Sequence, residues 1–503
     1  MGILALLPFP VAAYYAFARS PQYAFLRVYL PVMLLLPEYY RWIAPGLPDP
    51  TFSQAAILPI FLAFLLKDAK RWRFSGADLL VFGYAFCVGY SEYVNSGYSE
   101  AQNLIFNMFT WVLCPYILAK GLIEPHGLRI ELAKRLVFPL FLVSVISLYE
   151  FRFGSTPWRI ILDRFFPGQA VGWVTTFRWG LARIAGPYGH AILAGIMLVI
   201  GYRLQRWLQW NKAWEPHFKH LPSLPLSKAQ VLTVGLLGGV IMTLCKGPWG
   251  GAVLGAGLAA IGRVKNRKLA VNLLIAGILL IGIPAFIGLW SWASVGREYA
   301  KTVSQETAAY RKELIDHYVD IALAKSWWGW GLTKWPKVPG MPSIDNYYLL
   351  LALMHGLLAL GLFVALQFYM AVRLYWRGWH TPPPPLSGSS LAFTLLGIYA
   401  AFGFSVATVY MGNQVIPLFF LITGWAEGYL QFGREAVAVT QTVTHSQQLN
   451  GRVVPRHAVQ PSFTGFVSYG RRSPLLDGLP PHRTAMRRTP LGSAHFRFRR
   501  ILS

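Results

Sequence analysis

The chain has 503 residues, of which 55% are hydrophobic and 13% are charged, and its mean hydropathy is +0.42. Soluble globular proteins carry about 25% charged residues, so this composition excludes a soluble domain and predicts that lipid is the solvent for most of the chain. In a soluble protein the formal net charge of +26 would suggest a nucleic-acid partner. In a membrane protein, a positive-inside bias and anionic lipids account for it, so we expect membrane lipids and no nucleic acid as partners.

Long apolar runs follow one another as far as residue 432, and we interpret them as helices. They predict an all-α, polytopic integral membrane protein with about 12–13 transmembrane helices, the lower number applying if the first run, with Pro8 and Pro10, lies in the interface. Cys87, Cys114 and Cys245 lie in or beside these runs without metal-ligand spacing, so we interpret them as packing residues. The runs are 3–18, 22–40, 54–67, 76–92, 104–120, 134–150, 187–204, 229–245, 248–262, 269–291, 344–372, 391–410 and 414–432.

Loops rich in Lys and Arg recur between alternate helices, and the positive-inside rule places such loops in the cytoplasm. Segments 151–186 and 291–343 then face outward as the large outer loops. The first segment breaks the charge rule, since it carries Arg152, Arg159, Arg164, Arg178 and Arg183. An anionic ligand would explain arginines on that side. The alternative is that long loops are translocated whatever their charge.

From residue 433 the apolar pattern stops, and the tail 433–503 is rich in Arg, Ser, Thr, Pro and Gly. Such a segment buries too little apolar surface to fold alone. We therefore predict a membrane domain of residues 1–432 followed by a disordered, basic cytoplasmic tail. The charge of this tail suits the anionic cytoplasmic leaflet.

Two short motifs place cations beside helix starts on the predicted outer face. Gly186 and Pro187 precede a helix, so backbone N–H groups there should be open to an anion, and Arg183 adds a bidentate fork. His190, at the start of that helix, is interpreted as a polar residue of the bundle. Lys246 lies in a short turn between two apolar helices, where an ionisable residue points to function. An interfacial anchor at Arg183 and a snorkelling side chain at Lys246 are the alternatives.

The outer loop 291–343 is long for a compact membrane chain, and long loops are usually functional. Residues 310–317 are predicted to begin an amphipathic helix, with Ile315, Val319 and Ala322 on its apolar side and Arg311 among its polar residues. The tryptophans in 327–331 could stack on sugar rings or mark the membrane interface.

Asp345 and Asn346 stand at the start of the helix that follows this loop. A carboxylate is favoured there by the helix dipole and by capping, so a capping role alone would account for Asp345. A functional role is the other interpretation.

Taken in order, these features resemble the O-antigen ligase and Wzy-type O-antigen polymerase superfamily of bacterial membrane glycosyltransferases. The resemblance spans roughly residues 54–432, and two positions depart from the family pattern. Lys246 replaces the family Arg of the small turn, and Asp345 replaces the His that is the proposed general base in ligases. The matching features are Arg183-x-x-Gly186 with His190, Cys245-Lys246-Gly247, Arg311 with Trp328-Gly329-Trp330-Gly331, and Asp345-Asn346 nine residues before Gly356.

The resemblance implies glycan transfer from a polyprenyl-pyrophosphate-linked donor to a glycan or lipid hydroxyl, at the outer face of the bacterial cytoplasmic membrane. It implies no metal, nucleotide or other cofactor. A polymerase and an O-antigen ligase both fit, and a protein O-oligosaccharyltransferase stays open, as do a polysaccharide or lipid transporter and a membrane scaffold. A transporter should show internal repeats, of which the sequence gives no sign. The implied roles are pyrophosphate binding for Arg183, Lys246 and Arg311, acceptor activation for Asp345, and lesser catalytic parts for Asn346 and His317.

Overall fold

The computed structural model describes residues 2–44, 46–170, 172–218, 225–341, 343–381, 388–412 and 414–449. Met1–Val443 form one compact unit, and the second unit, Thr444–Ser503, is described only to residue 449. Helix α18 runs from Val415 to Leu449, so it continues past residue 432, where the sequence predicted the helix to end. The predicted disorder of the tail otherwise concerns residues outside the described ranges.

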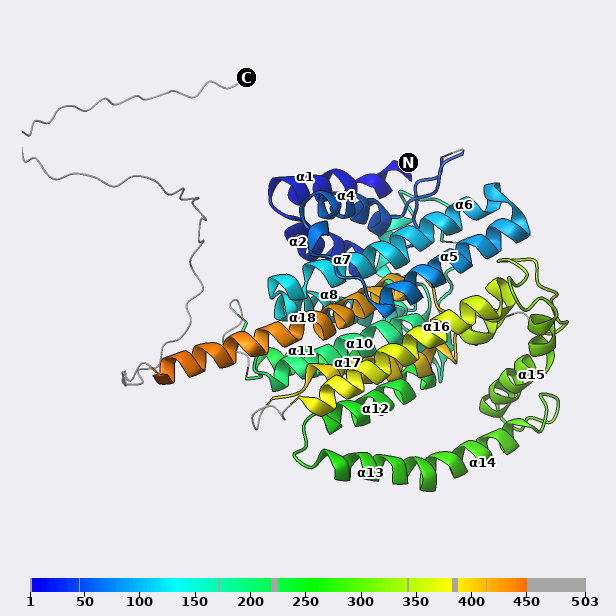
Figure 1. Ribbon diagram of the computed structural model, residues 1–503. Helices are drawn as coiled ribbons and strands as arrows, with labels where there is room; N and C mark the ends of the chain where they lie inside the picture. Colours follow the sequence, from blue (N-terminus) through cyan, green and yellow to red (C-terminus); the bar gives the residue numbers. More distant parts are fainter. Residues whose placement is uncertain are drawn as a thin grey trace, which may run out of the picture. The chain divides into compact units, whose positions relative to one another are not determined.

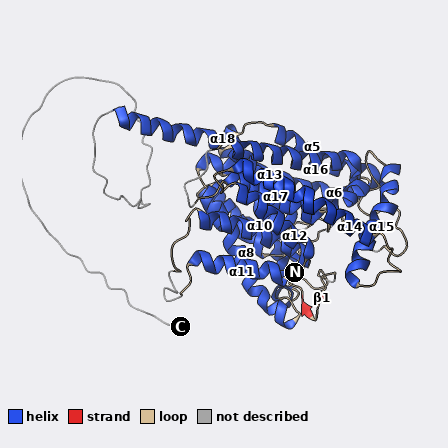
Figure 2. Ribbon diagram, turned by 90° about the horizontal axis from the view of Figure 1, so that it is seen from below, coloured by secondary structure: helices blue, strands red, loops and turns tan. Residues whose placement is uncertain are grey.

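The described chain is almost entirely helical, as predicted (Figure 1). The α-helices are α1 (Pro8–Ala18), α2 (Pro21–Ala24), α3 (Leu30–Leu35), α4 (Phe52–Lys67), α5 (Gly76–Ser96), α6 (Tyr98–Asn107), α7 (Cys114–Leu122), α8 (Arg129–Phe153), α9 (Pro157–Leu162), α10 (Ala191–Trp210), α11 (Lys228–Met242), α12 (Lys246–Ile261), α13 (Arg267–Gly277), α14 (Ile283–Ala293), α15 (Val303–Ala324), α16 (Tyr347–His380), α17 (Leu391–Val406) and α18. Short 3-10 or π segments are η1 (Gly2–Leu6), η2 (Phe25–Tyr29), η3 (Ala69–Arg71), η4 (Met108–Leu113), η5 (Glu124–His126), η6 (Gly186–Tyr188) and η7 (Ile278–Gly282). Strands β1 (Phe177–Arg178) and β2 (Leu181–Ala182) form a small antiparallel hairpin, which lies among the loops in Figure 2.

Every apolar run predicted to be a helix is largely helical in the structure. Within the described residues, six helical stretches are long and apolar enough to cross a membrane, and four shorter apolar helices accompany them. The chain is therefore an all-α polytopic membrane protein. Length and composition support fewer full spans than the 12–13 predicted, because several runs form helices below the roughly 20 residues that a span needs.

Small residues bring the central helices of the bundle close together. Along α12 and α17, a Cβ built on Gly255 would lie 2.4 Å from the carbonyl oxygen of Gly397, and one on Gly251 would lie 2.6 Å from that of Ala401. Such contacts are typical of membrane helices, which associate through close van der Waals packing because lipid provides no hydrophobic driving force between them. By contrast, α13 and α14 form one continuous helix, Arg267–Ala293, that lies apart from the bundle (Figure 1). The most apolar stretch of this helix has a mean hydropathy of 2.5, and none of its residues is buried. It is therefore suited to contact lipid on all sides.

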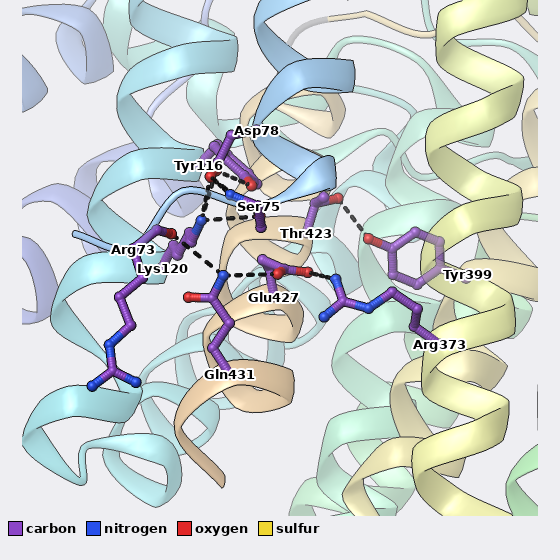
Figure 3. A network of polar contacts seen from close by, with 10 residues as sticks. All are labelled: Arg73, Ser75, Asp78, Tyr116, Lys120, Arg373, Tyr399, Thr423, Glu427 and Gln431. Carbon is purple, nitrogen blue, oxygen red and sulfur yellow. Dashed lines mark hydrogen bonds and ion pairs between the residues drawn. The ribbon is translucent and has the colours of Figure 1, made fainter. Parts of the chain in front are cut away.

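The basic loops meet at one end of the bundle. There Lys120 of α7 forms a buried ion pair with Asp78 of α5 at 2.6 Å, and Arg373 of α16 pairs with Glu427 of α18 (Figure 3). The side chain of Gln431 bridges Glu427 to the backbone of the basic loop before α5. Because the helices alternate in direction, segments 151–186 and 291–343 lie at the other end, where the candidate site is found.

Candidate active site

The turn between α11 and α12 is held by two arginines from the β1–β2 hairpin. Arg183 donates from Nε to the carbonyl oxygen of Thr243 at 3.2 Å and from Nη2 to Sγ of Cys245 at 2.8 Å. Arg178 donates from Nη1 to the carbonyl oxygen of Leu244 at 2.6 Å. The hairpin has a two-residue turn with positive φ at both positions, which suits the strand twist and brings the two arginines to the same turn.

A third arginine reaches the same place from α15. Arg311 donates from Nη2 to the carbonyl oxygen of Thr408 at 3.3 Å, and its Nε is buried without a hydrogen-bond partner in the described part of the chain. Thr408 itself lies against Gly247, where a Cβ would come within 2.2 Å of its hydroxyl oxygen. Burial lowers the pKa of Arg178, and the positive charges of Arg183 and Arg311 lower it further. Three guanidinium groups therefore share one electropositive site.

Lys246 begins α12 directly after the residues that bind Arg183. Its Nζ donates to Oγ of Ser304 on α15 at 3.0 Å, and the side chain is exposed. Cys245, at the N-cap of α12, makes no side-chain capping bond, so the first N–H groups of the helix lack this usual partner. The positive end of the helix dipole adds to the attraction for an anion.

Asp345 lies half-buried beside the arginines, and it does not cap α16. The cap is Asn346, whose Oδ1 accepts from the backbone N–H groups of Tyr348 and Leu349 at 3.0 and 3.3 Å. The capping interpretation of Asp345 is therefore wrong. Its Oδ1 accepts a bond from Oγ of Ser343 at 3.1 Å, and Oδ2 has no hydrogen bond within the described residues.

The charge of Asp345 acts on the pKa values of three neighbouring side chains. It opposes the burial that lowers the pKa of Arg311, and it contributes to raising the pKa of Tyr410, for which burial is the main cause. It also acts on His190. Burial and, to a smaller extent, Arg183 lower the pKa of His190, whereas Asp345 raises it. One carboxylate thus lies among cationic and hydroxyl groups from different helices.

His190 caps α10 and is neutral in that role. Its Nδ1 accepts from the N–H of Ile192 at 3.3 Å, so the ring proton must be on Nε2. Its ring centroid lies 5.9 Å from that of Tyr410. In this tautomer His190 can donate a hydrogen bond towards the site but cannot accept a proton at Nε2.

Backbone N–H groups ahead of α10 are not open to an external anion, contrary to the interpretation of Gly186 and Pro187 from the sequence. The buried carboxylate of Glu150 in α8 accepts from the N–H groups of Ala185 and Gly186 at 3.1 and 2.9 Å. Proline has no N–H to offer. Glu150 therefore anchors the segment that follows Arg183, and the anion-binding contribution is left to the arginine side chain.

The tryptophan-rich turn has a structural partner in α16. Gly356 interrupts this helix with φ of 80°, and the N–H groups of Trp330 and Gly331 donate to the carbonyl oxygens of Leu353 and Met354 at 2.8 and 2.9 Å. A Cβ on Gly356 would lie 2.2 Å from the carbonyl oxygen of Trp327. The Trp-Gly turn and Gly356, which lie apart in the sequence, are therefore in direct contact. This contact attaches the outer loop to α16, the helix that begins just after Asp345.

Residues 231–364 match the family model described as O-antigen ligase. The chain carries an O-antigen ligase domain. The match confirms the resemblance to the O-antigen ligase superfamily, and no curated protein matches the chain. The matched part of this O-antigen ligase domain contains Lys246, Arg311 and Asp345, whereas Arg178 and Arg183 come before it.

Not every predicted residue joins the site of the O-antigen ligase domain. His317 is exposed on α15, and no contact in the described structure links it to Asp345 or to the arginines. Of the predicted apolar side of α15, Ala322 is buried as expected, whereas the prediction is wrong for Ile315 and Val319, since their side chains are partly exposed. Leu314 and Tyr318 form the buried face together with Ala322. Packing against the residues that precede α16 selects the buried face.

Sequence reasoning did not place Arg178 and Tyr410 in the site. Arg178 lies five positions before Arg183, and only the hairpin turn at Trp179 and Gly180 brings the two together. A two-residue segment containing Gly between short extended stretches was the available signal. Within the described residues, no group of three or more His, Cys, Asp or Glu side chains is placed to hold a metal ion.

Proposed function

We propose that this site transfers a glycan from a polyprenyl-pyrophosphate-linked donor to an acceptor hydroxyl at the outer face of the cytoplasmic membrane. The observation that carries the proposal is the convergence of Arg178, Arg183 and Arg311 beside the half-buried carboxylate of Asp345. Cations gathered at the membrane end opposite the basic loops need an anionic partner. A pyrophosphate leaving group supplies the charge, and the O-antigen ligase domain supports lipid-linked glycan chemistry in general.

The arginines stabilise the pyrophosphate as it leaves. Guanidinium forks pair with phosphate oxygens in two parallel hydrogen bonds, and their charge is most effective where water is partly excluded. Arg311 has an unused buried Nε, and Arg183 presents Nη1 to an exposed hydroxyl, Thr176, at 3.3 Å. Lys246 and the start of α12 add positive charge at the same turn.

Asp345 accepts the proton of the attacking hydroxyl. The hydroxyl oxygen bonds to the anomeric carbon, the bond from that carbon to the pyrophosphate oxygen breaks, and the lipid pyrophosphate leaves with the electron pair. The carboxylate lies close enough to Arg311 for its charge to act on that guanidinium, so the proposed base and the cations for the leaving group belong to one site. Asn346 contributes by fixing the start of α16, since its amide oxygen is used as the cap.

The basic loops at the opposite end support an outer location for this site, by the positive-inside rule. A polysaccharide polymerase, an O-antigen ligase and a protein O-oligosaccharyltransferase would all use the same leaving-group chemistry. They differ in the acceptor, which is a growing glycan, a lipid-linked core or a protein hydroxyl. A non-enzymatic polysaccharide or lipid transporter would need no group positioned as Asp345 is.

Replacing Asp345 by Asn tests the proposal. Asn keeps the size of the side chain but accepts no proton, so transfer should fall by about 10²–10⁴-fold in membranes supplied with lipid-linked donor. Thermal stability should be unchanged, because Asp345 is not the cap. Asn346→Ala is the matched control, expected to lose about 0.5–2 kcal/mol of stability through the cap. Wild-type transfer by Asp345→Asn would remove Asp345 as the base.

A further inference from the structure

Three arginines surround the indole ring of Trp210, the last residue of α10. The guanidinium carbons of Arg203, Arg206 and Arg263 lie 5.8, 4.8 and 4.2 Å from the centre of that ring. Arg203 and Arg206 stand two turns and one turn before Trp210 on one face of α10. Arg263 comes two residues after the end of α12. An indole ring attracts cations at such distances, and guanidinium groups stack on it readily, so these side chains form one unit, the Trp210 cluster.

The guanidinium groups of the Trp210 cluster have almost no partners in the described part of the chain. Arg203 and Arg263 make no hydrogen bond or ion pair there, and Arg206 uses only Nη1, which donates to Oε1 of Gln209 at 2.6 Å. Arg203 is only 6% exposed, yet its unpaired nitrogen atoms keep some accessible surface, unlike Nε and Nη2 of Arg267. Burying a cation without a partner is costly. A ligand at the cluster can reach free N–H groups on all three arginines.

Other cations at the same end of the bundle do have an acidic partner. Lys134 and Lys228 each lie 5.0 Å from the ring centre of Trp214, and both pair with Glu215. Trp214 therefore has the same kind of cationic neighbours as Trp210, together with a carboxylate that they share. Like charges around one ring repel one another unless an anion joins them. Among the described residues, the Trp210 cluster has no such anion.

The cluster lies at the membrane boundary opposite the candidate active site. α10 starts next to His190, and its 20 residues span about 30 Å, which is the thickness of the hydrocarbon core. α12 starts at Lys246, beside the arginine site, and runs to the same end as α10. The ends of the two helix dipoles favour cations there. Within the described structure, however, no guanidinium group of the cluster donates to a backbone carbonyl, so the helix ends do not use these donors.

We propose that the Trp210 cluster is a binding site for phosphate groups at this membrane boundary. Guanidinium forks match phosphate oxygens through paired hydrogen bonds, and basic pockets between membrane helices bind anionic lipid head groups. Trp210 keeps the forks together through its ring. A lipid with two phosphodiesters, such as cardiolipin, matches three positive charges more closely than a lipid with one. The proposal does not depend on glycan transfer, and a bound phosphate would join the ends of α10 and α12.

Binding is measured with the full-length protein in a neutral detergent, titrated with cardiolipin and followed by the rise in unfolding temperature. Replacing all three arginines by Gln removes the charge and the forks. Each arginine near a membrane surface contributes about 5-fold to binding, so the triple variant should bind about 10²-fold more weakly. The matched control removes the same charge from exposed lysines at the same end, as Lys212→Gln, Lys265→Gln and Lys268→Gln combined. It should bind within about 3-fold of the wild type.

Arg263→Gln keeps the test decisive if loss of the buried arginine impairs folding. Arg263 is exposed, so this single variant should fold normally. It removes the guanidinium group closest to the ring and should weaken binding by about 5-fold.

The source of the phosphate is separated by the ligand. Cardiolipin that stabilises the wild type, where sodium pyrophosphate and phosphatidylcholine do not, identifies a lipid head group. Stabilisation by pyrophosphate that the triple arginine variant loses identifies a soluble phosphate compound. The site would be overturned if neither cardiolipin nor pyrophosphate stabilised the wild type, or if Arg263→Gln bound as the wild type does. Equal weakening in the arginine and lysine triple variants would also overturn it, because diffuse attraction to the basic end would then explain the binding.

Discussion

At the scale of single residues, His190 connects a helix cap to the charge of the site. Its ring must be neutral to accept the N–H of Ile192, and burial together with Arg183 keeps its pKa below the ordinary value. A histidine that protonates less readily in the folded state than in the unfolded state lowers the free energy of unfolding as the solution becomes acidic. Stability from this group is complete above the unfolded pKa of about 6.5 and is lost as the pH falls towards the folded pKa.

This linkage predicts how His190→Asn will respond to pH. Asn is also a good N-cap residue but does not titrate, so the variant should lose less stability than the wild type between about pH 7.5 and pH 5. The measurement is thermal unfolding of both proteins in the same detergent across that range. Parallel loss of stability in the two proteins would show that His190 does not titrate in this window.

Residue identity alone predicted some members of the site and missed others. The positive charges at Arg183, Lys246 and Arg311 could be identified from the sequence, because cations on the predicted outer face are conspicuous in a membrane protein. The sequence could not show whether Asp345 or Asn346 caps α16, because both residue types cap well and only the backbone geometry decides. The partner of the Gly186 N–H, Glu150, lies in a separate helix and leaves no local signal in the sequence.

At the scale of elements, the outer loop is attached to α16 through a break in that helix. The Trp-Gly turn donates two backbone hydrogen bonds to carbonyl groups that Gly356 leaves open. The same helix begins beside Asp345, so the attachment orients α15 and Arg311 towards the carboxylate. The sequence showed the spacing between these glycines and tryptophans but gave no reason for it, because the contact joins two distant segments.

Gly356→Ala should damage this attachment. Ala tolerates a positive φ poorly, and its Cβ would overlap the carbonyl oxygen of Trp327, so we expect a loss of at least about 1–3 kcal/mol and a lower unfolding temperature. Gly361→Ala, in the same helix with no atom within 4 Å of the new Cβ, should be neutral or gain up to about 1 kcal/mol. Equal stability of the two variants would contradict the account of the kink.

At the scale of the whole molecule, two polar regions lie at opposite ends of an apolar bundle. One end holds the basic loops and the buried pairs Asp78–Lys120 and Arg373–Glu427, which join α5, α7, α16 and α18 (Figure 3). The other holds the arginines and Asp345. The all-α fold and this alternation could be predicted from hydropathy and loop charge. The isolation of α13–α14 from the bundle could not, because a lipid-facing helix and a buried membrane helix are both apolar.

The most direct test of the account is glycan transfer by the purified, full-length protein from a polyprenyl-pyrophosphate-linked donor, comparing Arg183→Ala with Arg152→Ala. Both arginines belong to the outer segment, but only Arg183 binds the turn before α12, whereas Arg152 is exposed beside Phe153. The account predicts a loss of about 10²-fold or more in Arg183→Ala and near-normal transfer in Arg152→Ala, with the rates compared per amount of folded protein. Equal transfer by the two variants would contradict it.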